Sequence, residues 1–197
     1  GFRDILEIGR QMRQRMYAAV LEPEVPNYLA PGAFRQEIGE RIAHDGSVVR
    51  PLDESSVRAA AKKLVEAGVE GTAICFLFSF VNPSHERRAA EIIHEEYPHV
   101  ALSLSSDVDP AFREYERTVV TTFDAYIKPV IDRYLENLER GLTDAGIASP
   151  LQIMQSRGGI ASSEVVRKRP VRLFLSGPAG GVVGAQMVGR SAGIDNL

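Results

Sequence analysis

The chain has 197 residues, of which 44% are hydrophobic, 25% charged and 7% aromatic. These values are typical of a folded globular protein with a core of one domain or slightly more, so global disorder and collagen-like repeats are excluded. The formal net charge of −3 gives no basic surplus for binding nucleic acid or an anionic membrane. Since the sequence begins without methionine and ends without an evident closing element, we expect a piece of a longer protein.

The first 50 residues carry the weakest pattern. Asp4 is placed to cap a short helix over residues 5–8, and the prolines that follow predict a loop. Residues 34–42 fit either a helix face or alternating strand positions. The Asp-Gly pair at 45–46 favours a hairpin. We therefore expect residues 1–50 to form an irregular segment with a hairpin.

An α/β domain is predicted over residues 51–175. Asp53 is expected to cap the start of a helix with one apolar stripe, and Gly68 to end it. The continuous apolar run at 72–80 predicts a strand buried on both faces, and residues 100–105 alternate like a second strand.

The run at 72–80 contains the single cysteine of the chain, Cys75. One thiol excludes an intrachain disulfide, and a buried free cysteine is expected to act as a small hydrophobe rather than a nucleophile. The run has roughly half the length that a membrane-spanning helix needs. No secretory signal pattern is present, so the sequence predicts a cytoplasmic protein.

Helices are expected to alternate with these strands. Asn82 and Pro83 predict the N-cap and first turn of a helix that Pro98 ends. Strands that alternate with helices predict an α/β fold, with a mixed sheet, parallel pairing and flanking helices.

A long helical region is predicted from about residue 114 to 145, which Pro129 should kink or break and Gly146 should end. Residues 151–155 then predict a third short strand. The second half of the helical region is expected to bury one apolar face. Its members are Ile131, Tyr134, Leu135, Leu138 and Leu142.

The densest motif is a glycine-rich segment, VRLFLSGPAGGVVGA at 171–185. Residues 173–175 are expected to end a strand, with the helix N-cap at Ser176 or Gly177 and Pro178 in the first helical position. The segment suits a helix N-terminus that receives phosphate, a smooth stripe that lets a helix or nucleotide approach closely, or a loop. It matches neither a Walker A loop nor a dinucleotide fingerprint. The candidate nucleotide or hinge residues are Ser176, Gly177, Pro178, Ala179, Gly180, Gly181 and Gly184.

A second candidate group lies near the predicted start of the long helix. Arg113 and Arg117 are one turn apart, with Glu114 beside them, and two such arginines suit a carboxylate or phosphate. The alternative is a solvated face or an ion-pair network between lobes.

A third candidate group, MQSRGG at 154–159, follows a predicted strand, and open α/β sheets bind ligands at the carboxyl ends of strands. The alternative is a turn that uses two glycines. The candidate substrate or phosphate contacts are Gln155, Ser156, Arg157, Gly158 and Gly159. The histidines have no metal-ligand spacing, so no metal site is predicted, and no residue order identifies catalytic residues.

Six motifs occur in order: FRDILEIGR at 2–10, PLD at 51–53, NPSHE at 82–86, FREYERT at 112–118, MQSRGG at 154–159 and LSGPAGG at 175–181. Together they resemble the hydantoinase A / 5-oxoprolinase family, which includes ATP-dependent N-methylhydantoinases, oxoprolinases and subunits of ketone carboxylases. The resemblance spans essentially the whole chain. One departure is Arg157, which stands where the family pattern has asparagine.

The resemblance implies part of an ATPase lobe of the actin, hexokinase and heat-shock-chaperone type, with a ribonuclease H-like fold. That fold grips phosphates with two Asp-x-Gly-Gly-Thr hairpins and a metal ion, and this sequence contains neither hairpin. The chain is therefore expected to lie between the two hairpins. Residues 176–197 would then form the connecting helix at the hinge and a C-terminal stub.

The resemblance also implies an ATP-dependent amidohydrolase that opens a small cyclic amide, such as a hydantoin or 5-oxoproline, after phosphoryl activation of the amide oxygen. It implies ATP and Mg²⁺ for the parent protein, without tight binding to this inactive fragment, and a hydantoinase B-type subunit or domain as partner. The alternatives are a subunit of an ATP-dependent acetone or ketone carboxylase, and a fragment that acts only as an interaction or scaffold segment.

Overall fold

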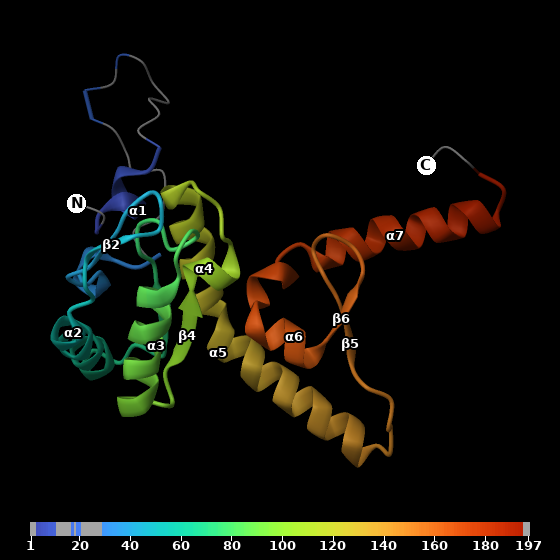
Figure 1. The fold of residues 1–197 in the computed structure, drawn as a ribbon. Coiled ribbons are helices and arrows are strands. Elements are labelled where there is room, and N and C mark those ends of the chain that lie inside the picture. Colours follow the sequence, from blue (N-terminus) through green and yellow to red (C-terminus); the bar gives the residue numbers. More distant parts are fainter. Residues whose placement is uncertain (1–2, 11–16, 18, 21–28, 195–197) are drawn as a thin grey trace. The chain divides into compact units, whose positions relative to one another are not determined.

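The computed structural model describes residues 3–10, 17, 19–20 and 29–194. The chain divides into two compact units, Gly1–Tyr126 and Ile127–Leu197, and the division falls inside its longest helix. Figure 1 shows the elements of both units. The sequence predicted boundaries at residues 50/51 and 175/176 and did not predict this division.

The first unit contains short helices, two strand pairs and the beginning of the long helix. In chain order these are α1 (Ile5–Ile8), the 3₁₀ turn η1 (Gly32–Phe34), β1 (Arg41–Ile42), β2 (Val48–Arg50), α2 (Glu54–Glu66), β3 (Gly71–Ile74), α3 (Ser84–Glu96), β4 (Ala101–Leu104), α4 (Ser105–Val108) and α5 (Glu114–Asp144). The short helix at 5–8 is confirmed. So is the hairpin, because β1 and β2 pair antiparallel around Gly46, whose φ is +85°.

The core of the first unit lies between α2, α3 and β3. The carboxylate of Asp53 accepts hydrogen bonds from the backbone N–H groups of Ser55 and Ser56, which confirms the predicted N-cap of α2. Gly68 takes a φ of +79° just after the helix. The buried apolar side chains of the core are Val57, Ala61, Ile74, Phe76, Ala89, Ile92 and Ile93.

Strands β3 and β4 are neighbours in a parallel pair, and helix α3 connects them along the chain. This part is therefore a βαβ unit, as the sequence predicted. The predicted strand over residues 72–80 is too long, however, because β3 ends at Ile74. Beyond Ile74, two buried side chains form hydrogen bonds with backbone groups that would otherwise pair in a sheet. Glu86 accepts from the N–H of Phe76, and Arg117 donates to the carbonyl of Phe76. Helix α3 begins at Ser84, whose N–H donates to the side chain of Asn82.

Helix α5 is continuous over its 31 residues, so the predicted break at Pro129 is wrong, although proline removes one backbone donor from the helix. The predicted buried face of its second half is confirmed in part. Leu135 is buried and Ile131, Leu138 and Leu142 are half-buried, whereas Tyr134 is 59% exposed.

The second unit joins the end of α5 to a hairpin and a final helix. Its other elements are β5 (Gln152–Met154), β6 (Ile160–Ser162), α6 (Ser163–Lys168), the 3₁₀ turn η2 (Pro170–Leu173) and α7 (Ser176–Ser191). The predicted strand at 151–155 is present as β5, but it pairs antiparallel with β6. The predicted strand end at 173–175 is wrong, because that stretch is the end of η2 and a turn.

The α/β class is confirmed. The described residues form three two-stranded sheets, of which β3–β4 is parallel and the other two are antiparallel. In that same part of the chain, no helix is long and apolar enough to cross a membrane.

Candidate functional site

The turn between β5 and β6 lies against the start of α7, so two predicted candidate segments meet in the second unit. Ser156 connects them. Its backbone N–H and its hydroxyl donate to the carbonyl of Arg172 at 2.7 and 2.6 Å, and the hydroxyl accepts from the N–H of Leu175 at 2.9 Å. This hydroxyl therefore uses its proton and one lone pair to hold the turn and the helix together.

Two glycines shape the turn itself. Gly158 and Gly159 have φ values of +75° and +84°, a region that residues with a side chain rarely adopt. The N–H of Gln155 donates to the carbonyl of Gly159 at 2.9 Å and closes the turn. Among the described residues, the side chains of Gln155 and Arg157 make no hydrogen bond or ion pair, and Arg157 is exposed. They are the side chains of this turn that remain available to a ligand.

Helix α7 contains the glycine-rich segment, so the loop interpretation of that segment is wrong. The helix begins at Ser176, with Leu175 as its N-cap, which moves the start two residues ahead of the predicted position of Pro178. A Cβ at Gly180 would lie 3.6 Å from Cγ of Met154 in β5. At Gly177, Gly181 and Gly184 a Cβ would meet nothing within 4 Å.

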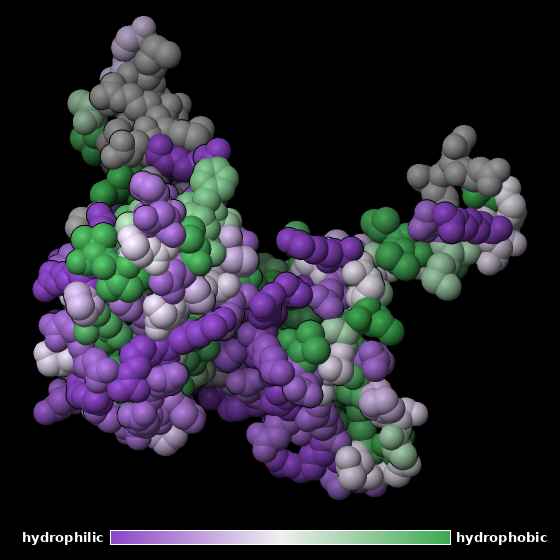
Figure 2. Space-filling view, in the orientation of Figure 1, coloured by the Kyte–Doolittle hydropathy of each residue, from purple (hydrophilic) through white to green (hydrophobic). Residues whose placement is uncertain are grey.

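Large apolar side chains on α7 are also uncovered in this structure. Val182, Val188 and Met187 are 71%, 70% and 66% exposed. In Figure 2 hydrophobic surface appears on this helix. The helix therefore carries both a glycine stripe and apolar side chains that other parts of its own unit do not bury.

The two arginines near the start of α5, Arg113 and Arg117, lie in the first unit and have different environments. Arg113 is exposed and lies over the ring of Phe112, 5.3 Å from its centre. Glu114 is exposed as well. Arg117, in contrast, is fully buried. The structure thus does not bring Arg113 and Arg117 together around one ligand.

Arg117 uses all three nitrogens of its guanidinium inside the fold. It donates to the hydroxyl of Ser105 at 3.2 Å and to the carbonyls of Ala111 and Phe76 at 2.7 and 3.0 Å. Its guanidinium also lies 5.3 Å from the centre of the Phe80 ring. These contacts hold the segment after β3 against α4 and α5.

Glu86 binds two of the residues that Arg117 also binds, Ser105 and Phe76, and the sequence did not reveal this role. It is fully buried, and its carboxylate accepts from the N–H of Phe76, the hydroxyl of Ser105 and the N–H of Ser106 at 2.9, 2.6 and 2.9 Å. A glutamate in the first turn of a helix is commonly solvated. The one feature of the sequence that could have singled out Glu86 is therefore its place in the NPSHE motif. The carboxyl ends of β3 and β4 are fixed by this buried polar cluster.

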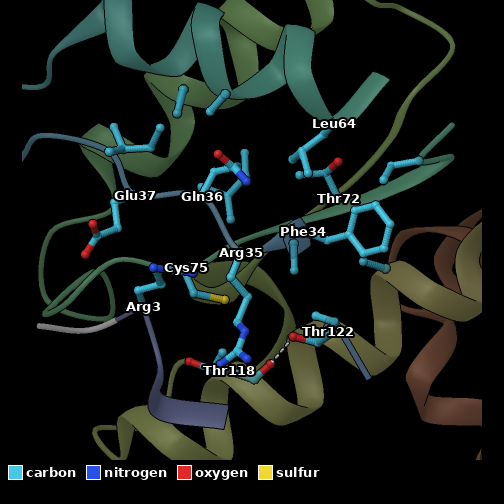
Figure 3. A pocket seen from close by; sticks show the side chains of 18 of the residues that line it. Arg3, Phe34, Arg35, Gln36, Glu37, Leu64, Thr72, Cys75, Thr118 and Thr122 are labelled. Carbon is cyan, nitrogen blue, oxygen red and sulfur yellow. Dashed lines mark hydrogen bonds between the residues drawn. The ribbon is translucent and has the colours of Figure 1, made fainter. Parts of the chain in front are cut away.

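A cavity of about 610 Å³ lies in the first unit, between α2, β3 and the first half of α5. Its lining is mostly apolar, and Figure 3 shows Arg35, Cys75, Thr118 and Thr122 among the side chains around it. Burial raises the pKa of the Cys75 thiol to about 12, so the thiol is protonated at neutral pH. No sequence motif marked the cavity, because its walls come from segments far apart in the chain.

Within residues 3–10, 17, 19–20 and 29–194, no three acidic, histidine or cysteine side chains come together in a group that could hold a metal ion.

Family models match nearly the whole chain. The hydantoinase/oxoprolinase N-terminal region matches residues 1–97, and the hydantoinase/oxoprolinase model matches residues 117–197.

Individual relatives agree with these models. The chain is 38% identical over 199 residues to the caprolactamase subunit alpha of Pseudomonas jessenii, covering 100% of this chain and 28% of that protein. It is 34% identical over 208 residues to a 5-oxoprolinase of Saccharomyces cerevisiae, covering 93% of this chain and 16% of that protein.

Two solved structures have a similar fold. The crystal structure of the ATP-dependent caprolactamase from Pseudomonas jessenii has a TM-score of 0.87 and 36% identity, over 100% of this chain and 28% of that one. The nucleotide-free structure of acetone carboxylase has a TM-score of 0.71 and 29% identity, over 88% of this chain and 24% of that one. The chain thus spans between about one sixth and somewhat over one quarter of the length of these relatives.

Proposed function

Because this chain belongs to the hydantoinase/oxoprolinase family, we propose that it forms part of an ATP-dependent enzyme that opens small cyclic amides. The observation that carries this proposal is the match to the ATP-dependent caprolactamase over 100% of the chain, with 38% sequence identity and a TM-score of 0.87. In such a reaction ATP would supply phosphoryl activation of the poorly reactive amide.

The described residues contain no group of three acidic, histidine or cysteine side chains that could hold a metal ion by themselves. The sequence also contains neither Asp-x-Gly-Gly-Thr hairpin of an actin-like ATPase lobe. Nucleotide and metal binding would therefore rest largely on residues other than these 197.

The contribution of the second unit is proposed to be a hinge. The stripe of Gly177, Gly181 and Gly184 offers a helix surface without side chains, and close approach of another helix would give these glycines a packing role. The uncovered Val182 and Val188 support contact with a further part of the enzyme, because exposed apolar groups commonly mark interaction surfaces.

The free side chains of the β5–β6 turn, Gln155 and Arg157, are proposed ligand contacts, as is the exposed Arg113. Arg157 replaces the asparagine of the family pattern, so it would offer a guanidinium where relatives offer an amide. Arg117 is proposed as a positioning residue, since its donors are occupied within the fold.

A hydantoinase B-type subunit is the proposed partner. The support is that a relative matching the entire chain is named as the alpha subunit of a caprolactamase. Co-purification of the full-length protein with such a subunit, and loss of lactam-dependent turnover when the subunit is removed, are the expected results.

The activity is tested by measuring ATP turnover of the full-length protein with its partner in the presence of different substrates. Stimulation by caprolactam, a hydantoin or 5-oxoproline, and not by acetone or acetophenone, is expected. The opposite pattern would assign the protein to the ketone carboxylases, an alternative that the acetone carboxylase match with a TM-score of 0.71 favours. No ATP turnover with either substrate class would leave the chain an interaction or scaffold segment.

The 197-residue chain alone is expected neither to hydrolyse ATP nor to bind it with micromolar affinity. Titration calorimetry with ATP and Mg²⁺ checks this expectation. Tight, Mg²⁺-dependent binding would contradict the assignment of the nucleotide site to other residues.

A further inference from the structure

The cavity of the first unit has the size and lining of a small-molecule site. Its volume of about 610 Å³ falls within the range that is usual for such sites, roughly 300–1,000 Å³. Side chains such as Ala60, Leu64 and Ile74 make its walls mainly apolar. A few polar groups would then decide which ligand is accepted.

Arg35 supplies an unused hydrogen-bond donor at this cavity. Its two terminal nitrogens donate to Glu7 at 2.6 Å and Asp4 at 3.4 Å. Its Nε is buried and has no partner among the described residues. Because a buried N–H group without an acceptor is unfavourable, a ligand oxygen at this point would satisfy it.

Thr122 supplies the complementary acceptor. Its hydroxyl proton is used within α5, where it donates to the carbonyl of Thr118 at 2.7 Å. The hydroxyl oxygen keeps accepting capacity, since an oxygen of this kind has two lone pairs. In Figure 3 the Arg35 side chain extends toward the part of α5 that carries Thr118 and Thr122.

The charges around the cavity favour a neutral ligand. The positive charge of Arg35 is already balanced by two carboxylates, those of Asp4 and Glu7. Arg3 lies 3.8 Å from the same Asp4 carboxylate, and Glu40 pairs with His85. Arg41 also lines the cavity, but it is exposed, and Glu37 adds a negative charge to the lining. A carboxylate on the ligand would therefore enter a mainly apolar site in which the described Arg3 and Arg35 already face carboxylates, which is costly.

We propose that this cavity binds a neutral cyclic amide, whose carbonyl accepts from Nε of Arg35 and whose N–H donates to the hydroxyl oxygen of Thr122. The methylene groups of the ring lie against the apolar walls. This inference rests on the proposed function and deepens it, because it locates the substrate and restricts its class to uncharged rings.

Binding is tested without ATP, by calorimetry and saturation-transfer NMR with three probes. Caprolactam is expected to bind. Caprolactone, which lacks the N–H group, is expected to bind about 3–10-fold more weakly, the usual effect of one lost hydrogen bond. The charged 5-oxoproline is expected to bind more weakly than both, and a preference for it would overturn the proposal.

Two substitutions test the location. Thr122→Val keeps a branched side chain and removes the acceptor, so caprolactam should bind about 3–10-fold more weakly while caprolactone is unaffected. The matched control is Thr143→Val, because Thr143 makes the same kind of bond, to the carbonyl of Glu139 in α5, outside the cavity. Ala60→Phe fills the cavity and should abolish binding of both rings.

The results of these binding experiments distinguish a failure of the proposed binding site from a failure of the proposed function. Unchanged caprolactam affinity in a folded Thr122→Val protein, or absence of caprolactam binding to the unsubstituted protein, overturns the site. Since Thr122→Val is nearly isosteric, it decides the question even where Ala60→Phe prevents folding. If instead the substitutions weaken binding as expected, but no cyclic amide stimulates ATP turnover of the full enzyme, the site stands and the proposed function fails.

Discussion

The hydroxyl of Ser156 accepts a hydrogen bond of 2.9 Å from the backbone N–H of Leu175. The same hydroxyl donates to the carbonyl of Arg172 at 2.6 Å. One small side chain thus ties the β5–β6 turn to the residue that caps α7. Two motifs that the sequence presents as separate candidates are parts of a single arrangement in the second unit.

Replacing this hydroxyl tests the connection. Ser156→Ala leaves the Leu175 N–H and one acceptor position on Arg172 without their protein partner, so the free energy of unfolding should fall by about 1 kcal/mol. Urea unfolding measures the loss, and amide hydrogen exchange should accelerate at Leu175. The control Ser191→Ala removes a surface hydroxyl that donates to Met187 at the other end of α7, and should change neither quantity.

The buried cluster of Arg117 and Glu86 is expected to dominate the stability of the first unit. Arg117→Met removes the donors to Ser105, Ala111 and Phe76, and two of these residues, Ser105 and Phe76, also bind the buried Glu86 carboxylate. Breaking one side of a buried charged network usually costs about 3–5 kcal/mol.

Chemical denaturation of the Arg117→Met protein measures this cost. The control is Arg140→Met, which breaks an exposed ion pair with Glu136 in the same helix, where a loss below about 1 kcal/mol is expected. Equal losses in both variants would mean that the buried contacts of Arg117 contribute no more than a surface pair.

Cys75 is expected to resist thiol reagents while the protein is folded. Burial raises the pKa of its thiol from 9.0 to about 12, so the reactive thiolate is scarce at pH 8. Alkylation by iodoacetamide should be slow in buffer and fast in urea, as followed by mass spectrometry. Rapid alkylation of the folded protein at pH 8 would contradict the environment described for this thiol.

The same shift gives a dependence of stability on pH. Because the folded protein holds the thiol proton more tightly than the unfolded chain, the stability linked to Cys75 is fully present below pH 9 and is lost as the pH rises toward 12. A Cys75→Ala protein should show a smaller decline of its unfolding midpoint over this alkaline range.

Asp53 gives a dependence of the opposite sign. The hydroxyl of Ser55 and the N–H groups of Ser55 and Ser56 hold the pKa of the Asp53 carboxyl below its ordinary value of 3.8. The stability that this cap provides is therefore present above pH 3.8 and is lost as the pH falls through the lowered pKa.

The cap is tested by thermal unfolding of two variants of Asp53. At pH 7 Asp53→Ala should lower the midpoint, whereas Asp53→Asn keeps a side-chain acceptor and should lower it less. An equal loss in both variants would mean that the charge, rather than the hydrogen bonds, stabilises the start of α2.

Local chemistry made several elements predictable from the sequence. Asp53 caps its helix through bonds to residues two and three positions ahead, and Gly46 and Gly68 take positive φ angles at a hairpin and a helix end. These features depend on neighbours in the chain and on backbone conformations that glycine permits. The order of the motifs, in turn, was enough to recognise the family.

What the sequence could not reveal depends on partners far away in the chain. The apolar run after residue 71 looks like one long strand, but Glu86 and Arg117 take the backbone of Phe76 and end the strand at Ile74. Arg113 and Arg117 look equivalent one turn apart, yet one is exposed and the other fully buried.

The sequence by itself thus determined the α/β class, the hairpin, the cap of α2 and the family. Short-range backbone and side-chain chemistry encodes the hairpin and the cap. Only the tertiary structure decided that Ser156 holds the start of α7, that Arg117 is an internal residue, and that Arg35 and Thr122 line one cavity. The physical reason is that burial and unused hydrogen-bonding groups arise when distant segments pack, and no local pattern records which segments will meet.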